Sequence, residues 1–248
     1  MLRVASYNIC KTIGTDLRRR PGRVLSVLQE LDADVVALQE VDRRFGARAA
    51  ALTPEAIAAE TPYRAIRFAV RPDSLGWHGN TILVRREVEV LGHRRIELPA
   101  FEPRGAVLAD LRVRGVAVRV IGMHLGLIGF WRRRQARAVL LALEALEEPR
   151  PTVMMGDLNE WTVDGGCLAM FARHHHVAEP GPSFHSRKPV AGLDRIITSL
   201  DLKVEAAGVH HSQHSRVASD HLPVWAQIVP AGPAMAAERQ QVARTPWI

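Results

Sequence analysis

The chain has 248 residues, of which 47% are hydrophobic and 24% are charged, and its formal net charge is +7 at pH 7. These proportions are ordinary for a globular protein and exclude a disordered, collagen-like or coiled-coil chain. No apolar run approaches about 18 residues, which excludes a transmembrane helix. The two cysteines are too few for a disulfide framework.

The basic charge suits an anionic partner such as nucleic acid, phospholipid headgroups or a small phosphate ester. Only three of the 33 cations are lysines, and an arginine excess of this kind equally reflects genomic base composition. The N-terminus lacks the pattern of a secretory signal, so we expect a cytoplasmic protein with no stable membrane insertion. We expect Cys10 to be a small core residue. The residues leave the oligomeric state open, with a monomer favoured.

In chain order, short apolar runs predict about eleven strands, and spaced apolar residues predict four helices. The helices are Pro21–Leu31, Arg48–Glu60, Trp131–Glu147 and Gly165–Arg173. The strands are Arg3–Ile9, Asp34–Gln39, Tyr63–Val70, Thr81–Val84, Glu87–His93, Ala106–Val113, Val116–Met123, Thr152–Met155, Leu193–Thr198, Lys203–Val209 and Leu222–Val229. This mixture favours an α/β arrangement of packed sheets with helices outside. We expect one domain over residues 1–229 and a loosely packed or disordered tail over 230–248.

Polar residues stand at the ends of several apolar strands, where a rigid sheet can present them to a cleft. Each one alone is more often a turn cap than a functional group, but six such clusters together favour a site. The pooled set contains the acids Glu40, Asp157, Asp194 and Asp220, the amides Asn8 and Asn159, and the histidines His124 and His221.

If these residues converge, four carboxylates need a hard divalent cation to offset their repulsion. Because no cysteine or histidine cluster has zinc spacing, Mg²⁺ or Mn²⁺ fits better. The run from His174 to His176 is a poor chelator, since consecutive side chains point in different directions. Histidines beside acids supply general acid or base chemistry, and amides suit a phosphoryl oxygen. The residues therefore indicate metal-assisted phosphoester hydrolysis.

Six ordered segments resemble the motifs of the endonuclease/exonuclease/phosphatase superfamily, whose members include deoxyribonuclease I, apurinic endonucleases, neutral sphingomyelinases and inositol polyphosphate phosphatases. The resemblance implies a four-layer α/β/β/α sandwich, in which two packed mixed β-sheets are flanked by helices. The segments are Tyr7-Asn8-Ile9, Leu38–Asp42, His124-Leu125, Gly156–Asn159, Leu193–Ile196 and Ser219–Val224.

The resemblance also implies a role for each matching residue. Glu40 is expected to be the principal metal ligand, helped by Asn8 and Asp220. His221 is expected to act as the general base or as an imidazole that binds the phosphate, and Asp194 is expected to hold it.

For the remaining matches, Asp157 is expected to orient or deprotonate the attacking water, and Asn159 to bind the phosphate. His124 is expected to contact another phosphate oxygen or to help the leaving group. Arg104 matches a position where nuclease-like members carry an arginine that faces the phosphate. Asn80 is a weaker match for phosphate binding, because a turn asparagine explains it equally well.

The substrate stays open at this point. The segment Met123–Gly126 favours the deoxyribonuclease, sphingomyelinase and phosphatase branches over the apurinic endonucleases. Two basic clusters, Lys11 with Arg18–Arg20 and Arg132–Arg134, could grip phosphates or simply be solvated. We expect a nuclease-like phosphodiesterase that uses in-line attack of an activated water. The alternatives are a phospholipid or sphingolipid phosphodiesterase, a small-molecule phosphatase, and a non-catalytic binding protein on the same fold.

Overall fold

A computed structural model describes residues 1–99 and 102–232. Within these residues the chain forms two six-stranded sheets. In spatial order, the first sheet contains β11 (Leu202–Val209), β12 (Val224–Pro230), β1 (Leu2–Asn8), β2 (Val35–Gln39), β4 (Thr81–Arg85) and β3 (Tyr63–Ala65). The second contains β5 (Glu89–Glu97), β6 (Gly105–Val113), β7 (Val116–His124), β8 (Thr152–Asp157), β10 (Asp194–Ser199) and β9 (His175–Ala178).

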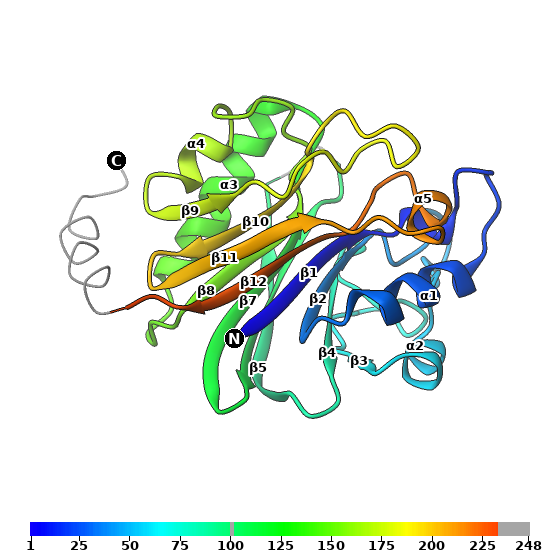
Figure 1. Cartoon of the computed structure of the whole chain (residues 1–248), viewed down its shortest axis with the longest axis horizontal. Helices are drawn as coiled ribbons and strands as arrows, with labels where there is room; N and C mark the ends of the chain where they lie inside the picture. Colours follow the sequence, from blue (N-terminus) through cyan, green and yellow to red (C-terminus); the bar gives the residue numbers. More distant parts are fainter. Residues whose placement is uncertain (100–101, 233–248) are drawn as a thin grey trace.

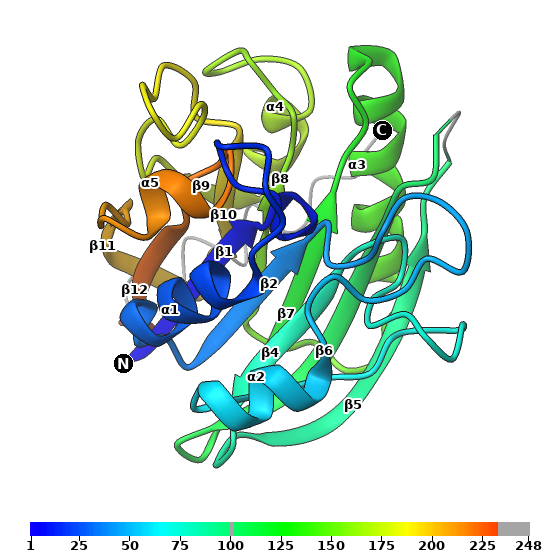
Figure 2. The same ribbon diagram turned by 90° about the vertical axis from the view of Figure 1, so that its right-hand side faces the viewer.

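The helices lie outside the two sheets (Figures 1 and 2). On the first sheet are η1 (Cys10–Thr12), α1 (Pro21–Leu31), α2 (Pro54–Glu60) and α5 (Ser215–Ala218), and on the second are α3 (Gly129–Glu144) and α4 (Leu168–Phe171). Three apolar cores separate the layers, one between the sheets and one beneath each set of helices. The predicted four-layer α/β/β/α sandwich of two mixed sheets is confirmed.

Helix α1 shows why the layers form. Val24, Val27, Leu28 and Leu31 recur at helical spacing and are all fully buried, so one stripe of the helix packs on the sheet. Central strands such as β2 are buried on both faces, which explains why β2 is apolar from Val35 to Leu38.

Strand register carries the polar strand ends to one end of the molecule. β7 and β8 are parallel with His124 opposite Asp157, and β10 runs antiparallel to β8 with Asp194 opposite Asp157. In the other sheet β1 and β2 are parallel, so Asn8 lies opposite Gln39 and next to Glu40 in space. The polar ends of these five strands therefore meet at one edge of the sandwich.

Several predicted elements differ from the observed ones. The helix predicted over Arg48–Glu60 begins only at Pro54, where the Thr53 side chain accepts a hydrogen bond from the Ala56 amide and caps the helix. The strand predicted over Tyr63–Val70 ends at Ala65. Strand β9 and helix α5 were not predicted, because each has four residues and no clear period.

The tail predicted over residues 230–248 is largely outside the described residues, which stop at 232. Pro230 itself ends β12 and belongs to the sheet. Among the helices that the structure describes, none has the length and apolar character needed to cross a membrane.

Candidate active site

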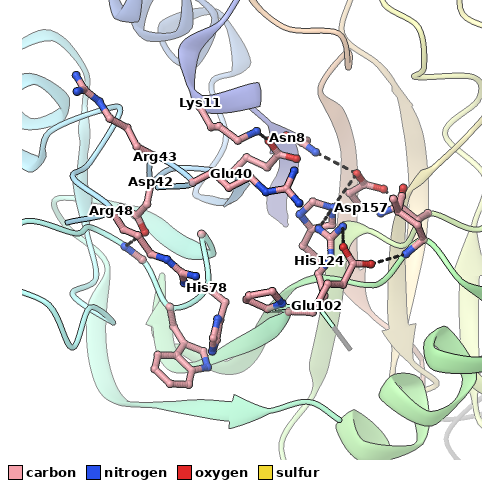
Figure 3. A pocket seen from close by; sticks show the side chains of 18 of the residues that line it. Asn8, Lys11, Glu40, Asp42, Arg43, Arg48, His78, Glu102, His124 and Asp157 are labelled. Atoms are coloured by element: carbon pink, nitrogen blue, oxygen red, sulfur yellow. Dashed lines mark hydrogen bonds and ion pairs between the residues drawn. The ribbon is translucent and has the colours of Figure 1, made fainter. Parts of the chain in front are cut away.

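A cavity of about 630 Å³ opens at the edge where β1, β2, β7 and β8 end and where β10 and β12 begin. Figure 3 shows its side chains converging from both sheets. The sequence-predicted residues that line it are Asn8, Glu40, Arg104, His124, Asp157, Asn159, Asp220 and His221. Asp194 is fully buried directly behind His221.

A buried histidine–aspartate pair forms the innermost part of the cavity. His221 Nδ1 lies 2.9 Å from Asp194 Oδ2, which also accepts a 2.6 Å hydrogen bond from the Ser183 hydroxyl. Since a carboxylate can only accept, Nδ1 donates, and the ring is held with Nε2 directed at the cavity. Nε2 lies 3.6 Å from Asp157 Oδ2.

These charges strongly influence one another because they lie in a dry environment. Burial alone lowers the pKa of His221, but the carboxylates of Asp194 and Asp157 outweigh it and raise that pKa to about 10. Burial raises the pKa of Asp157 to about 6, although the positive His221 opposes the shift. At neutral pH the pair is therefore an imidazolium beside a carboxylate.

Asp157 is held by two hydrogen bonds, and His124 lies beside it. The Asn8 amide donates to Oδ2 at 3.0 Å and the Asn159 backbone N–H donates to Oδ1 at 2.9 Å, while His124 Nε2 lies 3.4 Å from Oδ2. Gly156 makes this close meeting of β7 and β8 possible, because a Cβ there would lie 1.8 Å from the Met123 carbonyl oxygen.

His124 is neutral in this arrangement. Burial, and then the nearby positive Arg104, hold its pKa well below the usual value. Arg104 Nη1 lies 2.7 Å from His124 Nε2, and since a guanidinium only donates, Nε2 is the acceptor. The Arg104 guanidinium also binds Glu102 at 3.0 Å, which fixes its direction beside the cavity.

The other side of the cavity centres on Glu40. This residue follows β2 with a φ of 57°, a left-handed conformation that costs an ordinary side chain of order 1–3 kcal/mol. The turn directs the Glu40 carboxylate into the cavity, where it pairs with the Lys11 ammonium (Figure 3). Both side chains remain about one quarter exposed.

Two groups of residues could hold a metal ion. Glu40, Asn8 and Asp220 line the same cavity and carry side-chain oxygens, of which Asn8 Oδ1 also accepts a hydrogen bond from the Cys10 N–H at 3.0 Å. An all-oxygen set suits a hard divalent cation. A second set is Asp157, Asp194 and His221, whose ligand atoms lie within 4.8 Å of one another. The raised pKa of His221 leaves its ring protonated at both nitrogens near neutral pH, so it offers no lone pair to a cation and the Glu40 set fits better.

Two predicted phosphate ligands use their amides elsewhere. Asn80 is fully buried, does not line the cavity, and donates to the Gly105 carbonyl at 3.0 Å and to two other backbone carbonyls. Asn159 lines the cavity, but its amide donates to the Leu125 carbonyl at 2.9 Å. Both side chains hold the loops that shape the cavity.

The basic clusters separate into different environments. Lys11 lines the cavity, whereas Arg18, Arg19 and Arg20 are exposed outside it. Arg132 is buried against Glu160 at 3.3 Å, so it holds the start of α3 and is not available to a ligand. The His174–His176 run belongs largely to β9, far along β10 from Asp194.

Four arginines that sequence reasoning did not single out line the outer wall of the cavity: Arg43, Arg44, Arg48 and Arg71. Arg43 and Arg44, which are adjacent in the sequence and close to Glu40, could have been noticed as candidate phosphate-binding residues. Ser183 was not identifiable from the sequence, because its role depends on the tertiary contact with Asp194.

Comparison with known proteins decides the family. The sequence profile described as "Endonuclease/Exonuclease/phosphatase family" matches residues 5–221. The chain belongs to the endonuclease/exonuclease/phosphatase family. Family membership supports a phosphoesterase-type hydrolase, and the matched range contains every residue of the site described above.

A curated relative, the uncharacterized protein YbhP of Escherichia coli (strain K12), is 30% identical over 174 residues, which are 65% of this chain and 66% of the relative. YbhP of Shigella flexneri gives the same values. The chain thus matches just under two thirds of the length of these relatives.

Solved structures share the fold at low identity. An endonuclease/exonuclease/phosphatase from Bacteroides vulgatus has a TM-score of 0.74 and 18% identity, covering 93% of this chain and 99% of its own. A mannosyl-6-phosphatase from Bacteroides thetaiotaomicron has a TM-score of 0.69 and 19% identity, covering 92% and 100%. D. rerio TDP2 in complex with a single-strand DNA product has a TM-score of 0.68 and 19% identity, covering 92% and 98%.

Proposed function

We propose that this protein is a divalent-metal-dependent phosphodiesterase that cleaves its substrate by in-line attack of water. The observation that carries the proposal is the buried His221–Asp194 pair, whose Nε2 faces Asp157 across 3.6 Å at the inner end of the cavity. A histidine held by a carboxylate beside a second carboxylate is a means of positioning charge and protons around a phosphoryl group.

Each inner residue then has a distinct task. Asp157, held by Asn8 and Asn159, orients the attacking water and accepts its proton. His221 binds a phosphoryl oxygen through Nε2, and Asp194 keeps the ring in the required orientation. The Arg104 guanidinium, fixed by Glu102, adds a positive charge beside His124 and stabilises the negative charge of the transition state.

The Glu40 carboxylate, with Asn8 and Asp220, would hold Mg²⁺ or Mn²⁺. When bound, such an ion supplies positive charge to the phosphoryl oxygens. The Lys11 ammonium pairs with the same Glu40 carboxylate and partly neutralises it.

The breadth of the cavity supports a diester over a monoester. His221, Asp157 and their neighbours lie at one side of the cavity. The other side is a wall of arginines: Arg43, Arg44, Arg48 and Arg71. A substrate with groups on both sides of the phosphorus can therefore contact both walls. The nuclease-like and lipid-directed forms of the activity both satisfy this geometry.

The test is hydrolysis of an aryl phosphodiester and the matching monoester, with Mg²⁺, with Mn²⁺ and with a chelator. We expect metal-dependent turnover that favours the diester and is lost in His221→Ala. His210→Gln is the matched control, because His210 pairs with Glu30 at 2.8 Å outside the cavity. Equal turnover with and without chelator would overturn the metal mechanism, and faster monoester cleavage would overturn the diester assignment.

A further inference from the structure

Large apolar side chains are exposed beside the mouth of the cavity. Leu127 and Ile128, between β7 and α3, are 64% and 57% exposed, and Phe130 in the first turn of α3 is 53% exposed. Trp161 and Val163 after β8 are 61% and 67% exposed. We call these five residues the apolar rim. Leu127 and Trp161 also line the cavity itself, so the rim is continuous with the site.

The apolar rim is not a loosely held loop. Gln135 accepts a hydrogen bond from the Gly126 N–H at 2.8 Å, Arg132 donates to the Leu127 carbonyl at 2.6 Å, and Glu102 accepts from the Leu127 N–H at 3.1 Å. The buried Arg132–Glu160 pair then ties this segment to the loop that carries Trp161. The backbone is therefore fixed from below while the apolar side chains point outward.

Further exposed apolar residues occur on other loops at this end of the molecule. Leu17 follows β1, Phe45 follows β2 and Val70 lines the cavity, and they are 87%, 83% and 64% exposed. Figure 2 shows the dark blue loop after β1, the start of α3 and the yellow loop before β10 along the same upper side. The exposed apolar residues that line the cavity, Val70, Leu127 and Trp161, therefore come from three separate segments and do not form a stripe on one helix.

Cations accompany these apolar groups. Arg134 places its guanidinium 5.5 Å from the Phe130 ring centre and 5.6 Å from that of Trp131, and Arg133 beside it is exposed. Arg43 and Arg44 are exposed on the other side of the cavity. Asp164 is the exposed acid next to Val163, and Asp16 is neutralised by Arg23 at 2.7 Å.

We infer that this end of the molecule docks on an anionic phospholipid bilayer, so that the cavity receives a lipid headgroup phosphodiester. Apolar side chains that enter the acyl boundary, with cations at headgroup level, are the combination that binds an anionic membrane surface. The inference rests on the proposed function for the substrate class, and it supplies the partner that the proposed function leaves open.

Nucleic acid fits the same surface less well. Aromatic rings can stack on bases, but Leu127, Ile128 and Val163 have no π-face and gain nothing from a polyanion. A second copy of the chain fits poorly too, since two copies of the cationic surface around Arg133 and Arg134 would repel each other. An apolar medium with an anionic surface satisfies both kinds of side chain.

The test is flotation of the full chain with vesicles of phosphatidylcholine alone or mixed with phosphatidylglycerol. We expect binding to the mixed vesicles, and a loss of about tenfold or more in the variant Ile128→Ser/Phe130→Ser/Val163→Ser. The matched control, Val116→Ser/Leu141→Ser, removes side chains that are 53% and 50% exposed away from the cavity and should bind normally.

Arginine variants separate the contribution of charge to vesicle binding from that of the apolar side chains. Arg133→Gln and Arg134→Gln should each weaken binding about fivefold and reduce its salt dependence, whereas Arg173→Gln after α4 should not. The inference is overturned if the mixed vesicles do not bind, or if the apolar variant binds as the parent does. It is also overturned if sedimentation shows a dimer that only the apolar variant dissociates, or if the apolar variant loses duplex DNA binding instead.

Failure of the docking surface and failure of the proposed function give different results. Vesicle binding without hydrolysis of any phosphodiester would overturn the function and leave the docking surface in place. Hydrolysis of a soluble aryl diester without vesicle binding would overturn the docking surface and leave the proposed function in place.

Discussion

The two sides of the cavity differ in their access to water. On the inner side His124, Asp157, Asp194 and His221 are all at most 5% exposed and are joined by direct contacts. On the outer side the Lys11–Glu40 pair is about one quarter exposed, and the arginines beyond it reach solvent.

This difference assigns different tasks to the two sides. In the dry interior each charge depends on its partner, so protonation states and orientations are fixed before substrate arrives. On the exposed outer side, water and salt weaken each electrostatic interaction, so ions and substrates can exchange. We therefore expect inner substitutions to change turnover, and outer ones to change metal or substrate binding.

The largest expected effect is on the inner side. His221→Ala should lower turnover by about 10²–10³-fold with little change in KM, the range for losing one hydrogen-bond donor to the oxygens of the transition state. Steady-state kinetics on the aryl phosphodiester measure it, with His210→Gln as the control. A change confined to KM would make His221 a binding residue only and would remove the distinction between the two sides.

The next effect concerns the metal. Glu40→Gln should raise the Mg²⁺ concentration for half-maximal activity by about 10–100-fold, because even outer partners of a metal ligand contribute that much. Lys11→Met should lower that concentration, since it removes the ammonium that pairs with Glu40. Metal titrations of activity measure both, and a shift of the two variants in the same direction would count against Glu40 as the ligand.

A third effect is on stability and needs no metal. Because the pKa of His221 is raised from 6.5 to about 10, its stabilising contribution is fully present below pH 6.5 and is lost as pH rises through about 10. In chelator, the parent should exceed His221→Gln by about 1.5–3 kcal/mol near neutral pH, the usual contribution of a charged hydrogen bond. Denaturant unfolding across this range should show the difference disappear above pH 10; a constant difference would refute the ionised pair.

The smallest effect belongs to the outer arginine wall. Arg43→Gln and Arg48→Gln should each raise KM by about two- to fivefold at low salt, and salt should abolish the difference. Arg20→Gln is the control, since Arg20 is exposed but lies outside the cavity. If Arg20→Gln had the same effect, the arginine wall would act only through net charge.

Much of the fold and of the inner side was predictable from the sequence. Strands buried on both faces leave a clear apolar run, and a polar residue directly after such a run stands at the sheet edge. Parallel pairing of β7 with β8 then necessarily brings His124 beside Asp157. The family resemblance supplied the layer order, which strand counting alone did not.

The outer side was less predictable, for a physical reason. Loop arginines have no periodicity, and their partners depend on tertiary contacts: Arg132 pairs with Glu160, while neighbouring Arg133 is exposed. Asn80 is similar, because only the folded chain shows that its amide serves backbone carbonyls. Sequence position alone cannot distinguish a buried arginine with a structural role from an exposed arginine that can bind a ligand.

The most direct test of the central claim is a double-mutant cycle on His221 and Asp194, measured as turnover of the aryl phosphodiester with Mg²⁺. Asp194→Asn keeps the shape of the side chain that contacts Ser183 and His221. If the two residues act as one unit, the double variant His221→Ala/Asp194→Asn should be about as impaired as His221→Ala alone. Losses that simply multiply would show that the two residues act independently and would contradict the account.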